Sequence, residues 1–160
     1  MSEGRIFQLS VSDGGVPKLA VREAVLTPTG LEGDRQRDRR FHGGPERALC
    51  LYALERLLEL QEEGHPVFPG SVGENVTVVG LDWSGLAPGA RLALGEEVLV
   101  ELSSYTTPCK IIAASFKDGD FKRISQKLRP GDSRLYARVI RTGRLAVGQT
   151  VRLLNVNGRA

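Results

Sequence analysis

Residues 75–102 read NVTVVGLDWSGLAPGARLALGEEVLVEL, and this stretch decides the fold class. It contains three short runs of β-branched and other apolar residues, which favour strands, at 75–79, 91–94 and 98–102. Gly80 and Gly95 end the first two runs, and glycine is typical of turns. The stretch therefore predicts short strands joined by tight connections, as in a mainly β protein.

Strands are also expected on both sides of this stretch. The upstream candidates are residues 5–11 and 18–27, which would form a hairpin, and residues 48–52; the downstream ones are 135–141 and 150–154. Leucines at helical spacing predict a helix over 53–60, and shorter helical stretches are expected over 110–116 and 121–128. Eight or so strands with two or three short helices predict a mainly β, closed or partly closed barrel.

Composition is that of an ordinary globular domain. The chain has 160 residues, enough for one hydrophobic core, so residues 1–160 are expected to form a single domain. It is 41% hydrophobic and 26% charged. The longest apolar run, residues 48–54, is too short to cross a bilayer, and the N-terminus lacks the apolar stretch of a signal peptide. These features predict a cytoplasmic protein with no membrane partner.

Basic residues are concentrated in one polar segment, residues 28–42. Net charge is only +3, but residues 34–40 alone contain four arginines and two aspartates. Such a run is typical of a solvated loop, and non-specific contact with nucleic acid is the other interpretation. The chain has no recognition-helix signature and only 6% aromatic residues, so a nucleic-acid partner is not favoured.

Cys109 is the strongest candidate for chemistry. The chain is expected to pass from strand to helix near position 107, with Thr107 as the N-cap, Pro108 in the first helical position and Cys109 in the first turn. Free N–H groups, the helix dipole and the neighbouring Lys110 would lower the thiol pKa. Cys109 is therefore predicted to be a nucleophile or a soft metal ligand, the alternative being a small buried filler.

The second cysteine, Cys50, is predicted to be a core residue. Its neighbours are apolar or aromatic except Arg47. A reducing compartment would leave both cysteines as thiols, and nothing in the sequence supports a disulfide between them. The two cysteines and two histidines, His42 and His65, lack the paired spacings of structural zinc sites.

Two glycine-flanked polar segments could join Cys109 in a site. One runs from Gly33 to Pro45, and the other spans residues 70–75. If all three meet at one barrel mouth, a thiolate would be surrounded by arginine, histidine and N–H donors, which suits an anionic ligand with phosphate or oxo groups. Taken singly, each segment could be only a tight turn or the start of a strand.

The order of these pieces resembles the MOSC domain, the family named after the C-terminal region of molybdenum cofactor sulfurase. The similarity covers roughly residues 5–154, in the manner of a small stand-alone bacterial-type member. It is carried by Gly33-Asp34, His42-Gly43-Gly44-Pro45-Glu46-Arg47-Ala48, Gly73-Glu74-Asn75-Val76-Thr77, Pro108-Cys109, Tyr136-Ala137-Arg138-Val139 and Gly148. The resemblance implies a strand-rich barrel like that of pyruvate kinase.

The resemblance also implies roles for particular residues. Cys109 would be the catalytic cysteine, either coordinating molybdenum of the pterin cofactor or carrying sulfur as a persulfide. The expected cofactor-binding residues are Asp34, Arg35, His42, Gly43, Gly44, Glu74, Asn75, Lys110 and Arg138. Many relatives carry an arginine one or two residues before the Pro-Cys pair, where this chain has Thr106 and Thr107. The anion-binding charge would then come from elsewhere, with Lys110 and Arg138 as candidates.

Three functions follow from this sequence as hypotheses. The first is a molybdenum-cofactor-dependent oxidoreductase. The second is a sulfur carrier for maturation of the cofactor or of metal–sulfur clusters, working with a cysteine desulfurase or a molybdoenzyme; pyridoxal phosphate would then belong to the partner. The third is a non-catalytic module that binds an anionic metabolite or nucleic acid through the arginine-rich loop.

Overall fold

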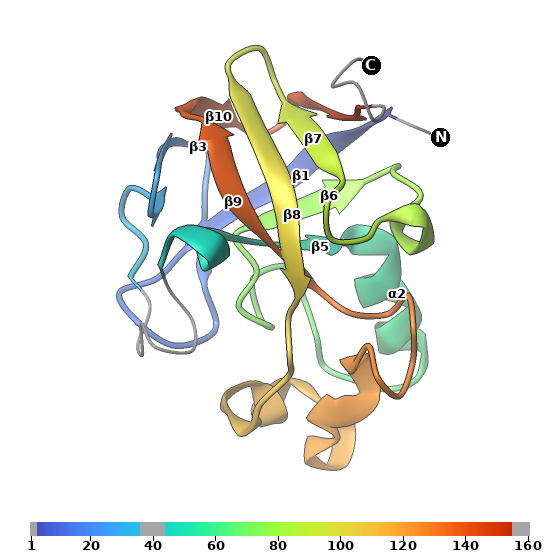
Figure 1. Cartoon of the computed structure of the whole chain (residues 1–160). Coiled ribbons are helices and arrows are strands. Elements are labelled where there is room, and N and C mark those ends of the chain that lie inside the picture. The colour runs from blue at the N-terminus through green and yellow to red at the C-terminus, as the bar shows by residue number, and fades with distance from the viewer. Residues whose placement is uncertain (1–2, 36–43, 155–160) are drawn as a thin grey trace.

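The structure, a computed structural model that describes residues 3–35 and 44–154, is built around a closed barrel of seven strands (Figure 1). The ring of strands runs β1–β11–β7–β8–β9–β5–β6 and returns to β1. Neighbouring strands are antiparallel except β5 and β6, which are parallel. Their bounds are β1 Glu3–Val11, β5 Leu49–Ala53, β6 Val76–Val79, β7 Arg91–Leu94, β8 Val98–Tyr105, β9 Leu135–Arg141 and β11 Thr150–Leu153. The predicted mainly β barrel is confirmed, and it is closed.

The remaining strands cover one side of the ring. β2 (Leu19–Val21) pairs with β1 and forms the predicted hairpin. β3 (Glu23–Thr27) instead joins β10 (Gly143–Ala146) and β4 (Gly30–Leu31) in a three-stranded sheet. The prediction of one strand over 18–27 is therefore wrong, because the chain changes its pairing partner between β2 and β3. β10 was not predicted.

Helical segments lie outside the barrel. α2 (Leu54–Glu62) follows β5 directly and buries Leu57 and Leu60, as the leucine spacing predicts. The expected helices over 110–116 and 121–128 are shorter 3-10 turns, η3 (Lys110–Ser115) and η5 (Phe121–Ile124), with η4 (Lys117–Gly119) between them. Two further turns are η1 (Pro45–Arg47) and η2 (Trp83–Gly85). None of the helices in the described part combines the length and apolarity needed to span a membrane.

The core fills the barrel with aliphatic side chains. Each of the following is at most 1% exposed: Ile6, Leu51, Val76, Leu92 and Leu102. Burying one such side chain contributes roughly 1.5–3 kcal/mol to folding.

Strand register decides which chain segments meet at one end of the barrel. Cys50 near the start of β5 lies opposite Tyr136 near the start of β9, and Tyr136 lies opposite Ser104 near the end of β8. The pairing continues beyond the strands, since Thr106 N–H donates to the carbonyl of Arg134 at 3.0 Å. This register brings both cysteine-bearing segments to the same end.

Candidate functional site

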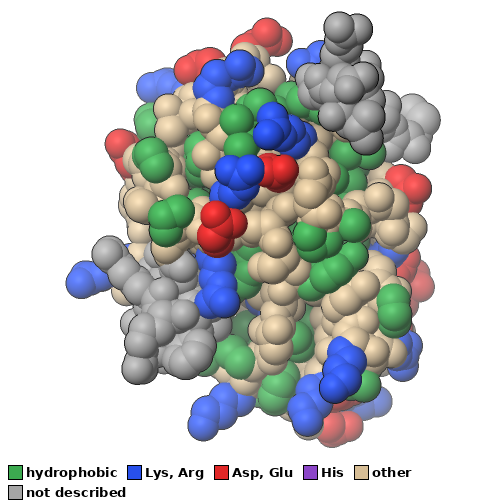
Figure 2. Space-filling view, viewed as in Figure 1, with side chains coloured by type: hydrophobic (Ala, Val, Ile, Leu, Met, Phe, Trp, Pro, Cys, Tyr) green, Lys and Arg blue, Asp and Glu red, His purple; other side chains and the backbone are tan. Residues whose placement is uncertain are grey.

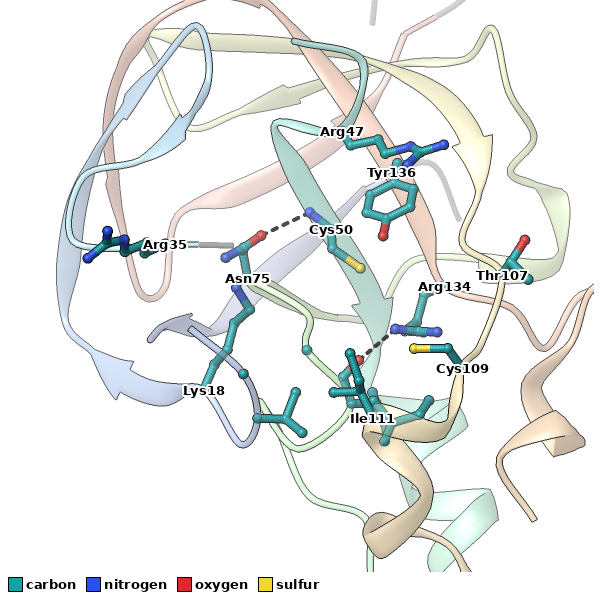
Figure 3. A pocket seen from close by; sticks show the side chains of 15 residues that line it. Lys18, Arg35, Arg47, Cys50, Asn75, Thr107, Cys109, Ile111, Arg134 and Tyr136 are labelled. Atoms are coloured by element: carbon teal, nitrogen blue, oxygen red, sulfur yellow. Dashed lines mark hydrogen bonds between the residues drawn. The ribbon is translucent and has the colours of Figure 1, made fainter. Parts of the chain in front are cut away.

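A pocket opens at this end of the barrel (Figure 3). Its walls come from residues 15–18, 72–75 and 107–112 and from the start of β5 and β9. The space between these walls is about 630 Å³ and is continuous with open solvent. Of the predicted site residues, the structure brings Arg35, Asn75 and Cys109 to this pocket.

Cys109 lies on the pocket wall but not inside a helix. Its φ of −137° and ψ of 170° are extended, and η3 begins one residue later at Lys110. The predicted N-cap at Thr107 and first-turn position of Cys109 are therefore wrong, because residues 107–109 continue the extended chain from β8 and the first turn is closed by Ile112 N–H on the Cys109 carbonyl at 3.2 Å. The Cys109 thiol is partly exposed, and in Figure 3 its sulfur points toward Arg134. Any electropositive surroundings come from side chains rather than from a helix dipole.

Arg134 is a functional candidate that the sequence analysis missed. The residue is only 6% exposed and lines the pocket. Its Nη1 donates to the Val72 carbonyl at 2.7 Å, whereas its buried Nε has no hydrogen-bond partner. Within the described residues, no carboxylate lies at ion-pair distance from it. In the sequence, Arg134 is recognisable only as an arginine directly before a predicted strand. That position does not indicate whether its side chain points into the pocket or toward solvent.

Cys50 is buried, as predicted for a core residue, and it also lines the pocket. It is 6% exposed and lines the same pocket as Cys109. Burial raises the pKa of the Cys50 thiol, and the nearby Arg134 charge opposes this rise only in part. Its Sγ lies 3.8 Å from Thr106 Oγ1. Cys50 is thus a buried neutral thiol beside the more accessible Cys109.

The side chains of Asp34 and Asn75 form a buried hydrogen-bond network. Their polar atoms bind other groups of the protein. Both carboxylate oxygens of Asp34 bind Lys18 Nζ, at 2.7 and 2.8 Å. Asn75 Oδ1 accepts the Cys50 N–H at 3.0 Å, and its Nδ2 donates to the Ser10 carbonyl at 3.2 Å and to Asp34 at 2.9 Å. Asn75 therefore lines the pocket while its side chain holds the surrounding loops and β5 in place.

Arg47 and Tyr136 occupy another side of the pocket. The Arg47 guanidinium carbon lies 5.7 Å from the centroid of the Tyr136 ring, a cation–π distance. Burial raises the pKa of Tyr136 to about 12, so its hydroxyl is protonated at neutral pH and can donate a hydrogen bond. Neither residue was among the predicted site residues, although Arg47 and Tyr136 lie within the motif segments.

Glu74 is fully buried and does not line the pocket. Thr77 Oγ1 donates to its Oε2 at 3.2 Å, while its buried Oε1 has no partner. Burial raises the pKa of the Glu74 carboxyl, against the opposing influence of hydrogen bonds and of Arg134. Its position supports a packing role, with the side chain held beneath the pocket loop.

Lys110 and Arg138 also lie off the pocket wall. Lys110 is exposed at the start of η3. Arg138 lies opposite Glu101 in the β8–β9 register and forms an ion pair with it. On the face seen in Figure 2, basic and acidic side chains lie beside each other over these strands. Arg138 does not line the pocket because it lies two residues beyond Tyr136 along β9, about 7 Å farther from the pocket end of the barrel.

The other predicted residues lie at or near the segment that precedes η1. Gly44 is the residue before η1, has a φ of 90° and does not line the pocket. His42 and Gly43 lie outside the described residues. Arg35 is on the pocket rim, with its side chain 70% exposed and 3.5 Å from Asp13. Among residues 3–35 and 44–154, no group of three or more His, Cys, Asp or Glu side chains could hold a metal ion.

Comparison with known proteins gives consistent matches. The family model of the MOSC domain matches residues 38–152. The protein YiiM of Escherichia coli is 35% identical over 108 residues, covering 65% of this chain and 48% of YiiM. YflK of Bacillus subtilis is 32% identical over 143 residues, covering 88% of this chain and 63% of YflK. The chain thus spans about half to two thirds of the length of these two relatives.

A fungal protein and a solved structure extend the comparison. A protein of Gibberella moniliformis named as a reductase is 29% identical over 130 residues, covering 79% of this chain and 23% of that protein. The crystal structure of E. coli YiiM superimposes with a TM-score of 0.69 at 26% identity, over 96% of this chain and 70% of YiiM.

Proposed function

Because this chain belongs to the MOSC domain family, we propose that its pocket binds the molybdenum cofactor and that Cys109 is the protein's sulfur ligand to the metal. One observation carries this proposal. Cys109 shares a pocket with four basic residues, Lys18, Arg35, Arg47 and Arg134, while none of the described residues that line it is acidic.

The side chains present fit such a group. A thiolate is the type of ligand that molybdenum favours in a soft, sulfur-rich environment. The phosphate of the cofactor requires cations and N–H donors, which arginine provides in a planar, bidentate arrangement. When bound, the metal centre would supply oxygen-atom or electron transfer, in line with the name of the fungal relative.

The residues of this chain would bind and orient the cofactor. Cys109 would hold the metal, and basic residues of the pocket wall would hold the anionic groups. Tyr136 lines the pocket, and its hydroxyl is protonated at neutral pH because burial raises its pKa to about 12. Val16, Val72 and Ile111 supply apolar surface to the pocket wall. The Asp34–Lys18–Asn75 network fixes the loops that carry these groups.

A second candidate function is sulfur transfer, favoured by the partial exposure of Cys109 in an open pocket. In this reaction the Cys109 thiolate attacks the terminal sulfur of a persulfide on a cysteine desulfurase. The S–S bond of the donor breaks, the donor cysteine leaves as a thiolate, and Cys109 becomes a persulfide with no net oxidation or reduction. Pyridoxal phosphate would act in the desulfurase that generates the donor persulfide, and a molybdoenzyme is a candidate acceptor.

Metal analysis of protein purified anaerobically from cells that make the cofactor tests the first proposal. We expect stoichiometric molybdenum in the wild type and in Cys50→Ser, and its loss in Cys109→Ser. Retention of the metal by folded Cys109→Ser would refute ligation by Cys109. Incubation with a desulfurase and cysteine tests the second, since the intact mass should rise by one sulfur atom and Cys109→Ser should show no gain. A chain that binds neither molybdenum nor sulfur would point to the non-catalytic binding module.

A further inference from the structure

We propose that Arg134 is the oxyanion-binding residue of the pocket, placing a phosphate or metal-oxo oxygen next to the Cys109 thiol. This inference deepens the proposed function and depends on it only for the identity of the ligand. The ligand class follows from the guanidinium, which binds two oxygens of a tetrahedral or oxo anion through parallel N–H donors.

The first observation is an unused donor on a buried charge. Arg134 is 6% exposed, and its hydrogen bond to the Val72 carbonyl at 2.7 Å uses Nη1. Its Nε is buried without any partner. A buried charge with an unmet hydrogen-bond donor is costly, and an anion in the pocket that Arg134 lines would offset the cost of burying the charge.

The second observation is that other cations of the pocket are already compensated. Both oxygens of Asp34 bind Lys18, and Arg35 lies near Asp13 and is mostly exposed. No carboxylate of residues 3–35 and 44–154 forms an ion pair with Arg134, and its charge has only a minor lowering influence on the pKa of the buried Glu74 carboxyl, which burial raises. Arg134 therefore retains an uncompensated charge next to the pocket space.

The third observation is the position of Arg134 in the barrel. Its carbonyl accepts the Thr106 N–H at 3.0 Å, so Arg134 lies across from Thr106, three residues before Cys109. Figure 3 shows its guanidinium and the Cys109 sulfur directed toward each other. Arg134 thus brings a cation to the wall of the pocket that Cys109 also lines, whereas the threonines at 106 and 107 supply none. Neither Lys110 nor Arg138 is needed for this charge.

The proposal is tested by alkylating Cys109 with two reagents that react by the same mechanism but differ in charge. Iodoacetate is an anion and iodoacetamide is neutral, and both transfer a substituted methyl group to the thiolate with loss of iodide. The rate ratio, iodoacetate over iodoacetamide, is measured at Cys109 by peptide mass mapping of the full chain. We expect this ratio to exceed that of N-acetylcysteine, and Arg134→Met to lower it about tenfold, since charge-assisted hydrogen bonds are of that strength.

Matched variants separate the local charge from a structural effect. Arg134→Lys should keep most of the ratio, because the positive charge remains. Arg138→Met removes one arginine outside the pocket and should change the ratio less than about twofold, since exposed charges are screened. An unchanged ratio in folded Arg134→Met, checked by circular dichroism, overturns the proposal.

Protection of Cys109 from alkylation by inorganic anions tests the proposal even if Arg134→Met does not fold. Phosphate should slow iodoacetate alkylation of wild-type Cys109 in a saturable manner, and Arg134→Lys should require more phosphate for the same protection. No saturable protection of the wild type by either phosphate or molybdate overturns the proposal. Stronger protection by phosphate assigns Arg134 to the phosphate end of the ligand, and stronger protection by molybdate assigns it to the metal-oxo end. Because no cofactor is used, failure here leaves molybdenum ligation by Cys109 to its own test.

Discussion

Asn75 Nδ2 donates a hydrogen bond of 2.9 Å to Asp34 Oδ2, joining two segments that are 41 residues apart in the sequence. Asp34 also accepts from Lys18 and, at 2.9 Å, from the Ser12 N–H. Asn75 in turn receives the backbone N–H of Cys50. This network links the loop after β1, the loop after β4 and the start of β5, and so sets the shape of the pocket.

Asp34→Asn should destabilise the protein strongly. The variant leaves the buried ammonium of Lys18, 8% exposed, without its anion, and breaking a buried pair in this way costs about 3–5 kcal/mol. Urea unfolding measures the loss. Glu23→Gln is the matched control, because its partner Arg144 and Glu23 are both more than half exposed, and it should cost at most about 1 kcal/mol. Equal effects of the two substitutions would contradict the prediction.

The unfolding free energy of Glu74→Gln should increase relative to that of the wild type as pH rises. Burial raises the folded-state pKa of Glu74 above the ordinary value of 4.5, so the native protein keeps this proton at pH values where the unfolded chain has lost it. The unfolding free energy of the wild type therefore falls as pH rises from 4.5 to the raised pKa, and glutamine removes this dependence. Urea unfolding across this range tests the sign. A difference between variant and wild type that does not vary with pH would rule it out.

The two cysteines should differ in reactivity toward iodoacetamide. Cys109 is partly exposed, whereas Cys50 is 6% exposed and burial raises the pKa of its thiol. A raised pKa reduces the thiolate fraction and burial restricts access of the reagent, so Cys50 should react more slowly than Cys109. Mass spectrometry of labelled peptides gives both rates. Cys109→Ser should leave only the slow reaction, and comparable rates for the two wild-type thiols would be inconsistent with this geometry.

Arg123→Met should raise the pKa of Glu63. The Arg123 guanidinium binds both oxygens of Glu63, at 2.8 and 2.7 Å, and this contact lowers the pKa of the Glu63 carboxyl. The pair stabilises the native state above the unfolded value of 4.5, and this contribution is lost as pH falls through the lowered pKa. NMR titration of the Glu63 side chain measures the change. An unchanged Glu63 titration in the folded variant would show that the contact has no effect in solution.

Local patterns in the sequence were sufficient for most of the elements. The β-branched runs at 75–79 and 98–102 correspond to β6 and β8, and the leucine spacing at 53–60 corresponds to α2. Patterning works here because the side chains that fill the barrel alternate along each strand. It failed at residues 18–27, where a continuous β-favouring run divides between two sheets, because pairing partners are not encoded by propensity.

The sequence by itself determined that this chain forms a mainly β barrel of the MOSC family, with Cys109 as its candidate reactive residue. Only the tertiary structure decided which charges surround that thiol. Arg134, just before β9, and Cys50 line the same pocket as Cys109, whereas Arg138 pairs with Glu101 outside it. The physical reason is that strand register and side-chain direction depend on contacts between residues far apart in the chain, which neighbouring residues cannot specify.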